Sequence, residues 1–540
     1  MLTTAEIVAA TLAGRGIRRV FGLPGGENAE LLGACRRLGI DFVLTRHENA
    51  ACIMASVTGE LTRTPGIAMA TLGPGATNLV NGVANAYLER SPLLVISAQV
   101  PTAIARVLPH QRVNLQDLFR PITKWSETLT GADTAETVQR ALDLTTEGRP
   151  GPVFLALPSD VARREEPAPW SRADSPPQED LPLPAVTPTG SSLAQAAQMI
   201  SEARRPLAVA GIGLDVLKAQ PNLLRWLEAA RMPVAVTPKA KGLVPENHPL
   251  FLATCTGMAG DRLFAELIPE ADLLIGIGFD PVEAIRPFYL ERPFLSVADY
   301  SVAESEWSPA LELIGDVPGT LETLARDAKP THTWSPDLLP AFRQRLAAFL
   351  TPSQSQTELG LSPARLFGRL RDLVPRDTIL TVDTGAHKLL ISQIWRCYQP
   401  RTYFVSHGLS TMGHAVPAAL AAKLEYPGRP VTAVTGDGGL AMVLSELETA
   451  SRLRLPIVVV VVSDRSLHLI RIHQERKGFK PSGVDFGPID FAGIAEGFGC
   501  RGVLVLSWAD LENAITAAFA VDRPTVIEVP IDPADYNQML

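Results

Sequence analysis

The chain has little cysteine, no long apolar run and no block of basic residues. Its five cysteines are scattered and form no CxxC pair, which argues against a disulfide framework and against a zinc site. The apolar runs fall well short of the roughly 18 residues that cross a bilayer, so no membrane association is expected. The N-terminus lacks a charged head before an apolar core, and a net charge of −8 argues against nucleic acid as a partner. These absences predict a soluble, cytoplasmic protein.

Length and patterning predict an α/β protein of three domains. A chain of 540 residues suggests roughly two to four domains, and its apolar and charged fractions, 46% and 20%, are near those of an average globular protein. Short apolar runs alternate with helical patterns, as is typical of parallel sheets covered by helices. We predict domains over residues 1–165, 191–330 and 361–540, joined by polar linkers over residues 166–190 and 331–360. The predicted strands are RRVFGL, DFVLT, GIAMAT, PLLVISA and PVFLAL, then PLAVAGIG, PVAVTP, DLLIGIG and PFLSVAD, then TILTVD, TYFVSHG, VTAVTGDG, PIVVVVVSD and PTVIEVP.

A glycine turn follows one of these strands, in the stretch VTAVTGDGGLAMVLSELE that starts at Val431. Gly436, Gly438 and Gly439 permit a tight turn into a helix and leave backbone N–H groups open to a ligand. Since a helix N-terminus favours negative charge, a diphosphate is the expected ligand. Asp437 would repel that diphosphate unless a cation lies between them, and Mg²⁺ suits such oxygen ligands. For the GDG triplet alone, an ordinary turn is the alternative.

The next strand, in PIVVVVVSDRS from Pro456, delivers a second carboxylate. Its apolar run stops abruptly at Ser463 and Asp464. Ligands of open α/β sheets bind outside the carboxyl ends of the strands, so Asp464 becomes a second oxygen ligand for the cation. A polar turn after any strand is the alternative, but the order of turn, helix, valine strand and terminal aspartate favours a site.

This order of elements resembles the cofactor motif of the thiamine diphosphate (ThDP) enzymes, which starts with GDG and ends in a pair of asparagines after the next strand. Here Ser463 and Asp464 stand in place of that pair. The resemblance assigns Asp437, Asp464 and the backbone carbonyl of Ser466 to the metal ion. It assigns cofactor contacts to a wider set, namely Asn28, His387, Ser410, Met412, Gly436, Gly438, Gly439 and Leu469.

A second element, DFVLTRHENAACIMASVTGEL from Asp41, places Glu48 at the predicted start of a helix. The helix dipole stabilises an acid at this place, which alone would explain Glu48. In the ThDP enzymes that the stretch resembles, a glutamate after a similar RHE hydrogen-bonds the aminopyrimidine ring and promotes deprotonation of the cofactor. The stretch TLGPGATNLVNG, from Thr71, is similar to the pyrimidine-binding domain of the same family. The resemblance therefore makes Glu48 the activating residue.

The segment SHGLSTMGHAVPAAL resembles a third part of the family's site. Met412 matches the bulky apolar residue over which such enzymes bend the cofactor, and Ser410 lies where a backbone carbonyl receives the 4′-amino group. Core filling is the alternative role for Met412. Because Glu48 and the GDG turn lie in different domains, the resemblance implies that they meet across a subunit interface, in a homodimer or a dimer of dimers.

Nearly the whole chain is similar to the acetolactate synthase-like group of this family, with parallels in FGLPGG, HQRVNLQDLFRPITK and GLSTMG. That group decarboxylates a 2-keto acid and adds the remaining fragment to a second keto acid or aldehyde. A transferase or lyase that uses ThDP and Mg²⁺ is therefore expected. One alternative is a non-ligating decarboxylase or carbon–carbon lyase. Another is a catalytically degenerate ThDP-binding paralogue, which the substitution at Asp464 motivates.

Three further candidate catalytic residues follow from this resemblance. Gln111 matches the glutamine of a synthase-like FQE stretch, whose phenylalanine is replaced by His110. Simple decarboxylases carry histidines in this region, so His110 is a candidate proton donor, with a solvent-facing loop histidine as the alternative. Glu27 follows the PGG turn and is a candidate acid or base, with a helix-start acid as the alternative. Ile470 stands where decarboxylases carry a protonating glutamate, which favours carboligation or lyase chemistry.

The predicted middle domain raises the question of a flavin. In FAD-bearing acetolactate synthases a segment reading roughly GARFDDR contacts FAD, and the matching residues here are GIGFDPVEA, from Gly276. Gly278 and Val282 replace its two arginines, so two guanidinium contacts are absent. FAD stays open as a cofactor at this point, while the chain is expected to differ from the FAD-bearing biosynthetic enzyme.

Overall fold

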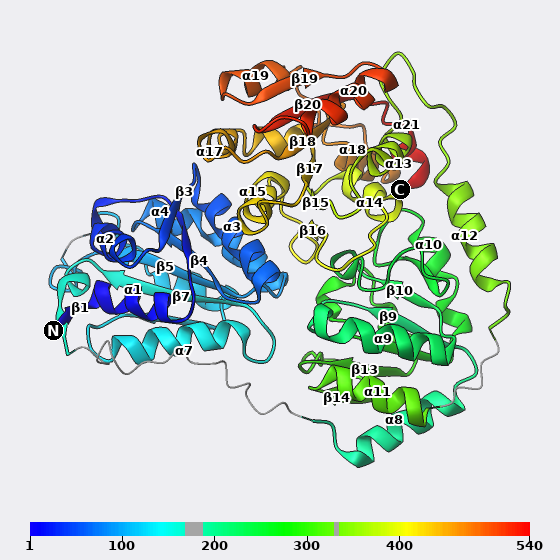
Figure 1. The fold of residues 1–540 in the computed structure, drawn as a ribbon, viewed down its shortest axis with the longest axis horizontal. Helices are drawn as coiled ribbons and strands as arrows, with labels where there is room; N and C mark the ends of the chain where they lie inside the picture. Colours follow the sequence, from blue (N-terminus) through cyan, green and yellow to red (C-terminus); the bar gives the residue numbers. More distant parts are fainter. Residues whose placement is uncertain (108, 168–186, 329–333) are drawn as a thin grey trace. The chain divides into compact units, whose positions relative to one another are not determined.

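The computed structural model of the protein describes residues 1–107, 109–167, 187–328 and 334–540. These residues form three six-stranded parallel sheets with helices on their faces, and an antiparallel pair of β1 (Leu2–Thr3) and β8 (Glu165–Glu166) (Figure 1). The predicted α/β class with three parallel sheets is thereby confirmed. Residues 168–186 and 331–333 of the two predicted linkers lie outside the described residues, and the predicted domain boundaries stay predictions.

The first sheet has the strand order β3-β2-β4-β5-β7-β6. Its strands are β2 (Arg19–Gly22), β3 (Asp41–Leu44), β4 (Gly66–Ala70), β5 (Leu93–Gln99), β6 (Trp125–Thr128) and β7 (Pro152–Pro158). Its helices are α1 (Thr4–Gly14), α2 (Ala29–Arg37), α3 (Glu48–Thr62), α4 (Pro74–Asn78), α5 (Val80–Leu88), α6 (Leu115–Phe119) and α7 (Thr134–Thr146). The inner strands β4 and β5 are apolar almost throughout because both of their faces are buried.

The second sheet has the strand order β11-β10-β9-β12-β13-β14. Its strands are β9 (Pro206–Ala210), β10 (Val234–Val236), β11 (Phe251–Thr254), β12 (Leu273–Ile277), β13 (Phe294–Ala298) and β14 (Leu311–Ile314). Its helices are α8 (Gly190–Glu202), α9 (Val216–Ala230), α10 (Asp261–Ala265), α11 (Val317–Asp327) and α12 (Leu338–Phe349). This is a doubly wound order, and the winding reverses between β9 and β12.

The third sheet has the strand order β16-β15-β17-β18-β20-β19. Its strands are β15 (Ile379–Val382), β16 (Tyr403–Val405), β17 (Val431–Gly436), β18 (Val458–Ser463), β19 (Arg501–Leu504) and β20 (Thr525–Pro530). The helices of this region are α13 (Pro363–Leu373), α14 (Ala386–Ile394), α15 (Ala415–Glu425), α16 (Asp437–Ala441), α17 (Glu446–Arg452), α18 (His468–Arg476), α19 (Phe491–Gly497), α20 (Trp508–Ala518) and α21 (Ala534–Met539). Since β17 and β18 are parallel neighbours, with Gly436 paired to Val462, the turns that follow them lie at one edge of the sheet.

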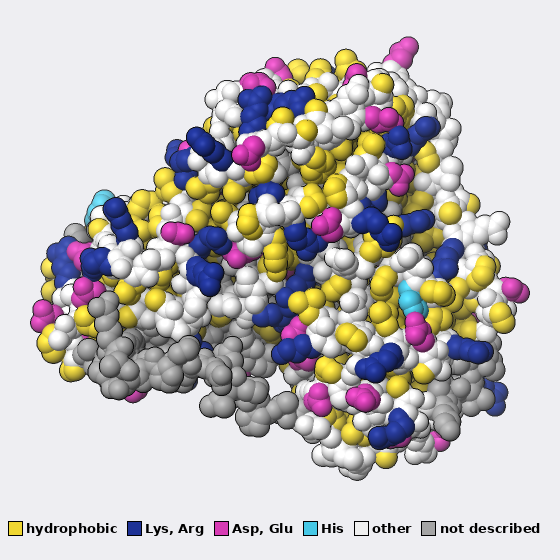
Figure 2. Space-filling view, viewed as in Figure 1, with side chains coloured by type: hydrophobic (Ala, Val, Ile, Leu, Met, Phe, Trp, Pro, Cys, Tyr) yellow, Lys and Arg dark blue, Asp and Glu magenta, His cyan; other side chains and the backbone are white. Residues whose placement is uncertain are grey.

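The chain divides into two compact units. One unit contains the first sheet together with Gly408–Gly428 and Val443–Leu455, and the other contains the second and third sheets. Within the first unit, α15 packs against α3, and Arg19 forms an ion pair with Glu425 at 2.6 Å. Across the described residues we find no helix with both the length and the apolarity needed for a membrane span. Lys and Arg lie among Asp and Glu on the face drawn in Figure 2.

Candidate functional site

The first half of the candidate site begins where β3 ends and α3 starts. His47 caps α3, because its Nδ1 accepts a hydrogen bond from the Asn49 N–H at 3.1 Å. The buried Glu446 fixes the same turn from α17, accepting hydrogen bonds from the N–H groups of Arg46 and His47 at 2.9 and 3.1 Å. Glu48 is the first residue of the helix, so the His47 cap and the Glu446 contacts together fix its backbone position.

The side chain of Glu48 is buried, with only 6% of the residue exposed. Its Oε2 accepts a hydrogen bond from Asn78 Nδ2, at the end of α4, over 3.0 Å. Gly75 passes close by: a Cβ there would lie 3.3 Å from Glu48 Oε1 and 2.8 Å from Thr71 Cγ2. The glycine turn after β4 thus leaves room for the carboxylate, which points at this turn.

Two other predicted catalytic residues lie at the same turn. The Thr71 hydroxyl donates to Glu27 Oε2 over 2.9 Å, and Glu27 is partly exposed. Gln111 has a left-handed backbone, with φ of 54°, and a Cβ on Gly73 would lie 2.9 Å from its own Cβ. The structure therefore brings Glu27, Gln111 and Glu48 to the segment between Thr71 and Gly75. His110 is exposed in the loop beside Gln111.

Three of the residues predicted to contact the cofactor also belong to this unit. Asn28 is buried, and its Oδ1 accepts from the Gly25 N–H at 2.9 Å, while its Nδ2 has no hydrogen-bond partner among the described residues. Ser410 has a left-handed backbone, with φ of 57°. Met412 is half-buried.

The second half of the candidate site lies at the carboxyl ends of β17 and β18. Asp437 Oδ2 accepts hydrogen bonds from the N–H groups of Asp464 and Arg465, at 3.1 and 2.7 Å, and Oδ1 accepts from the Gly438 N–H at 2.7 Å. Burial, followed by the negative charge of Asp464, raises the pKa of Asp437 to about 6. The carboxylates of Asp437 and Asp464 are thus close enough to repel each other. A bound cation would relieve this repulsion.

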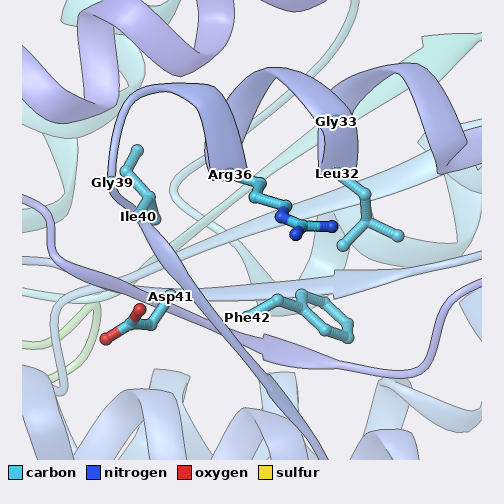
Figure 3. A pocket seen from close by; sticks show the side chains of 7 residues that line it. All are labelled: Leu32, Gly33, Arg36, Gly39, Ile40, Asp41 and Phe42. Atoms are coloured by element: carbon cyan, nitrogen blue, oxygen red, sulfur yellow. The ribbon is translucent and has the colours of Figure 1, made fainter.

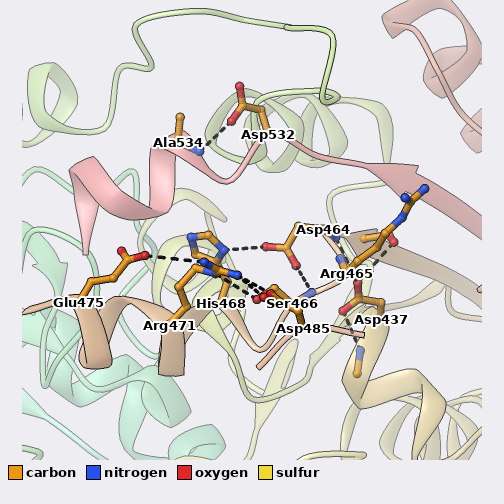
Figure 4. Close-up of polar contacts among 12 residues, drawn as sticks. Asp437, Asp464, Arg465, Ser466, His468, Arg471, Glu475, Asp485, Asp532 and Ala534 are labelled. Atoms are coloured by element: carbon orange, nitrogen blue, oxygen red, sulfur yellow. Dashed lines mark hydrogen bonds and ion pairs between the residues drawn. The ribbon is translucent and has the colours of Figure 1, made fainter. Parts of the chain in front are cut away.

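Asp464 is held by residues that follow it in the chain (Figure 4). Its Oδ1 accepts from the Ser466 N–H at 3.2 Å, and its Oδ2 lies 3.1 Å from His468 Nδ1. Nowhere in the described chain do three His, Cys, Asp or Glu side chains converge as a metal site. Asp437 and Asp464 fit a hard cation that takes its other ligands from backbone carbonyls, water and phosphate.

The glycines of the GDG turn are in contact with a buried His387 and Asp383. A Cβ at Gly436 would lie 3.2 Å from His387 Cε1, and one at Gly439 would lie 2.8 Å from Asp383 Oδ2. Burial lowers the pKa of His387 to about 3, so the ring is neutral, and its Nε2 has no hydrogen-bond partner in the described part of the chain. Leu469, also predicted at the site, is half-buried against the core of the third sheet.

The crevice of the second sheet, between β9 and β12, is occupied by the chain itself. The N–H groups of Gly211 and Gly213 donate to carbonyls at the end of β12, at 3.0 and 2.6 Å. The N–H of Ile212 donates to Glu283 Oε2 over 3.0 Å. A Cβ at Gly211 would lie 2.4 Å from that oxygen, so the Glu283 carboxyl fills the space at the turn.

The start of α9 beside this crevice carries paired charges, because Lys218 and Arg401 lie 3.7 and 3.5 Å from the Asp215 carboxylate. The Asp215 carboxylate accepts from the Leu217 N–H at 3.2 Å, and Asp299 Oδ2 accepts from the Asp215 N–H at 2.7 Å. A dinucleotide pyrophosphate needs free N–H groups and positive potential at this place. The N–H groups of this turn are taken by the chain itself, and the cations at the start of α9 are paired with Asp215, so these residues do not fit the pyrophosphate of FAD.

The buried Glu283 makes stability depend on pH in a direction that can be tested. Burial raises its pKa from 4.5 to about 8, so the folded protein keeps this proton over a range in which the unfolded chain has released it. Stability therefore falls as pH rises from about 4.5 to about 8. We expect Glu283→Gln to melt above the wild type by a margin that grows from about pH 5 to about pH 8. Thermal melts across this range measure the effect, with the exposed Glu136→Gln as control. A constant difference in melting temperature between Glu283→Gln and the wild type would refute the raised pKa of Glu283.

One hollow on the first domain lies away from all these groups (Figure 3). It has a volume of about 440 Å³ and lies between α2 and β3. Its lining residues are Leu32, Gly33, Arg36, Gly39, Ile40, Asp41 and Phe42. None of them was predicted at the site, and we assign the hollow no part in catalysis.

Four contacts of the site escaped the sequence analysis. Asn78, Thr71 and Glu446 contact the predicted residues from elements that only the fold brings near. His468 gave no local signal either, because Asp464 precedes α18 and the i, i+4 spacing of a helix does not apply to this pair.

Three family models match the chain, one for each sheet. The N-terminal TPP binding domain of the thiamine pyrophosphate enzymes matches residues 2–119, their central domain matches residues 193–324, and their C-terminal TPP binding domain matches residues 383–529.

Curated relatives match the chain over nearly its whole length. The catabolic acetolactate synthase of Raoultella terrigena is 33% identical, over 98% of this chain and 95% of its own. The probable acetolactate synthase large subunit of Methanocaldococcus jannaschii is 31% identical, over 99% and 93%. The acetolactate synthase of Bacillus subtilis is 30% identical, over 98% and 93%.

Proposed function

Because the chain belongs to the thiamine diphosphate enzymes, as an acetolactate synthase-like member, we propose that it decarboxylates a 2-keto acid and joins the remaining fragment to a second carbonyl compound. It is a ThDP-dependent enzyme of the carboligase/decarboxylase class. Pyruvate is the first donor to test, because the relatives are named acetolactate synthases.

The observation that carries the proposal is the gathering of three polar side chains at one glycine turn. Glu48, Glu27 and Gln111 all lie at the segment that follows β4, and Glu48 is buried there. A buried carboxylate at a helix start, with one oxygen held by Asn78, is suited to exchanging a proton with a bound ring. We assign this role to Glu48, and the handling of the substrate's proton and carbonyl oxygen to Glu27 and Gln111.

Bound ThDP supplies the nucleophilic carbon and the positively charged ring that accepts the electrons released with CO₂. Around it, the chain orients groups and controls protons. Asn78 directs the Glu48 carboxylate, and Thr71 does the same for Glu27. The exposed His110 is assigned only to substrate entry or proton exchange with solvent. Ile470 offers no proton, which favours a carbon electrophile over protonation.

We further propose that Mg²⁺ links the diphosphate to Asp437 and Asp464, with the Ser466 carbonyl as another ligand. Support comes from the two neighbouring carboxylates at adjacent strand ends and from the repulsion between them, which a divalent cation relieves. The glycines at positions 436, 438 and 439 allow the diphosphate to approach the backbone of the turn.

The assembly proposed is a homodimer or a dimer of such dimers. Glu48 lies in one compact unit of the chain and Asp437 in the other. On the resemblance to the family, Glu48 of one copy and Asp437 of a second copy serve the same cofactor.

FAD is not a cofactor in this proposal, because the Glu283 carboxyl takes the Ile212 N–H and the cations at the start of α9 are paired with Asp215. We expect no quenching of FAD fluorescence when the purified full-length protein is added at concentrations well above micromolar. Quenching that saturates would contradict this part of the proposal. Flavin binding would leave the ThDP chemistry itself untouched.

The activity is tested with the full-length protein, ThDP, Mg²⁺ and pyruvate. The expected products are CO₂ and acetolactate, or a mixed hydroxyketone when an aldehyde is added. Release of free acetaldehyde alone would replace carboligation by simple decarboxylation, and cleavage of an added hydroxyketone would indicate a lyase. A protein that shows no calorimetric binding of ThDP with Mg²⁺ would be a degenerate paralogue.

A further inference from the structure

Asp464 and His468 form a buried pair beside the proposed cation site. Asp464 follows β18, and His468 is the first residue of α18. His468 Nδ1 lies 3.1 Å from Asp464 Oδ2, and the two side chains are 8% and 7% exposed. Figure 4 shows the ring turned toward this carboxylate. The proposed chemistry does not require a histidine here.

The ring of His468 is fixed in place by packing. Its centroid lies 5.8 Å from that of Tyr536, a buried residue of α21. Its second nitrogen, Nε2, has no hydrogen-bond partner among the residues that the structure describes. Among the described residues, the one polar contact of the ring is the ion-pair contact of Nδ1 with Asp464 Oδ2, and that oxygen likewise has no hydrogen-bond partner there.

The neighbouring arginine is engaged elsewhere. Arg471, on the next turn of α18, forms ion pairs with both oxygens of Asp485 and lies 3.8 Å from Glu475. Its Nε donates to Ser466 Oγ over 3.4 Å. The Ser466 N–H therefore donates to one Asp464 oxygen, and His468 Nδ1 is the polar group beside the other.

A carboxylate suits this contact better than an amide. Each oxygen of Asp464 has two lone pairs, so it can face a polar group of the protein on one side and keep a lone pair for a cation on the other. The NH₂ group of an asparagine has no lone pair to offer, either to an Nδ1–H donor or to a metal ion. Asp464 and His468 therefore belong together chemically.

We propose that His468 is a positioning residue for the cation: the close polar contact of its Nδ1 with Oδ2 orients the Asp464 carboxylate, so that two carboxylates, those of Asp437 and Asp464, bind the metal. This inference rests on the proposed function, since it presupposes a cation shared with the diphosphate. Groups that orient metal ligands typically change metal affinity by about 10- to 100-fold when removed.

The test measures Mn²⁺ binding to the full-length protein with ThDP present, by the electron paramagnetic resonance signal of free Mn²⁺. We expect His468→Leu to weaken Mn²⁺ binding by about 10- to 100-fold, because an apolar side chain places no polar group beside Asp464 Oδ2. His468→Gln keeps an N–H donor and should recover most of the affinity. His473→Leu, an exposed histidine of the same helix, should bind like the wild type.

A double-mutant comparison separates positioning from packing. In an Asp464→Asn background, His468→Leu should cause little further loss of Mn²⁺ affinity, since its partner is already gone. An equal loss in both backgrounds would overturn the inference, as would wild-type affinity in His468→Leu. Failure of the wild-type protein to bind Mn²⁺ at all would instead refute the proposed metal site.

Discussion

Glu48→Gln is expected to lose activity by about 10²- to 10⁴-fold while still binding ThDP, which is the range that a positioned acid–base group contributes. The glutamine amide has nearly the same size and still offers an oxygen to Asn78 Nδ2, so the buried contact at 3.0 Å is preserved. It cannot exchange a proton with the aminopyrimidine ring. The measurements are the rate of CO₂ release from pyruvate and calorimetric titration with ThDP and Mg²⁺.

The matched control is Glu136→Gln, the same exchange at an exposed position of α7. It should retain wild-type rate and ThDP affinity. An unchanged rate in Glu48→Gln would remove Glu48 from its assigned role. Loss of ThDP binding and rate together would instead give this residue a part in holding the cofactor.

Asp437→Asn should reduce ThDP affinity in the presence of Mg²⁺ by roughly 10²- to 10⁴-fold, as expected when one member of a buried charge pair is lost at about 3–5 kcal/mol. The variant retains an oxygen that accepts from the N–H groups around it, but it loses the charge that attracts the cation. Calorimetric titration at a pH well above 6 measures the effect, because Asp437 is then ionised in the wild type.

Asp522→Asn provides the control, since Asp522 is exposed in a turn before β20 and is distant in sequence from the GDG motif. Its ThDP affinity should equal that of the wild type. A melting temperature of metal-free Asp437→Asn close to that of the wild type would show that the fold is intact. Wild-type ThDP affinity in Asp437→Asn would contradict the assignment of Asp437 to the metal.

The sequence predicted the inner strands of all three sheets but not most of the edges. Every strand predicted from the apolar runs is present. In the three six-stranded sheets, the four strands that escaped prediction, β6, β11, β14 and β19, all lie at sheet edges, and the two-residue strands β1 and β8 escaped it as well. In β6, β14 and β19 most side chains are partly exposed, so their sequences WSET, LELI and RGVL carry no continuous apolar run.

The candidate site divides in the same way. The contact between Asp437 and the start of the Asp464 turn was predictable, because consecutive parallel strands with a helix between them place their carboxyl ends side by side. The contact of Glu27 with Thr71 was not predictable. It depends on the pairing of β2 with β4 in the sheet, although β3 lies between them in the sequence. The approach of Gln111 to Gly73 depends on a left-handed backbone at Gln111, which glutamine rarely adopts.

The central claim is that Glu48 of one copy and Asp437 of another serve a single cofactor, and mixed dimers test it most directly. Glu48→Gln and Asp437→Asn subunits, each inactive alone, are co-expressed with different tags and the mixed dimers are isolated. Shared sites leave one of the two sites in each mixed dimer intact, so about half of the wild-type activity per dimer is expected. Mixed dimers as inactive as either parent would contradict the claim.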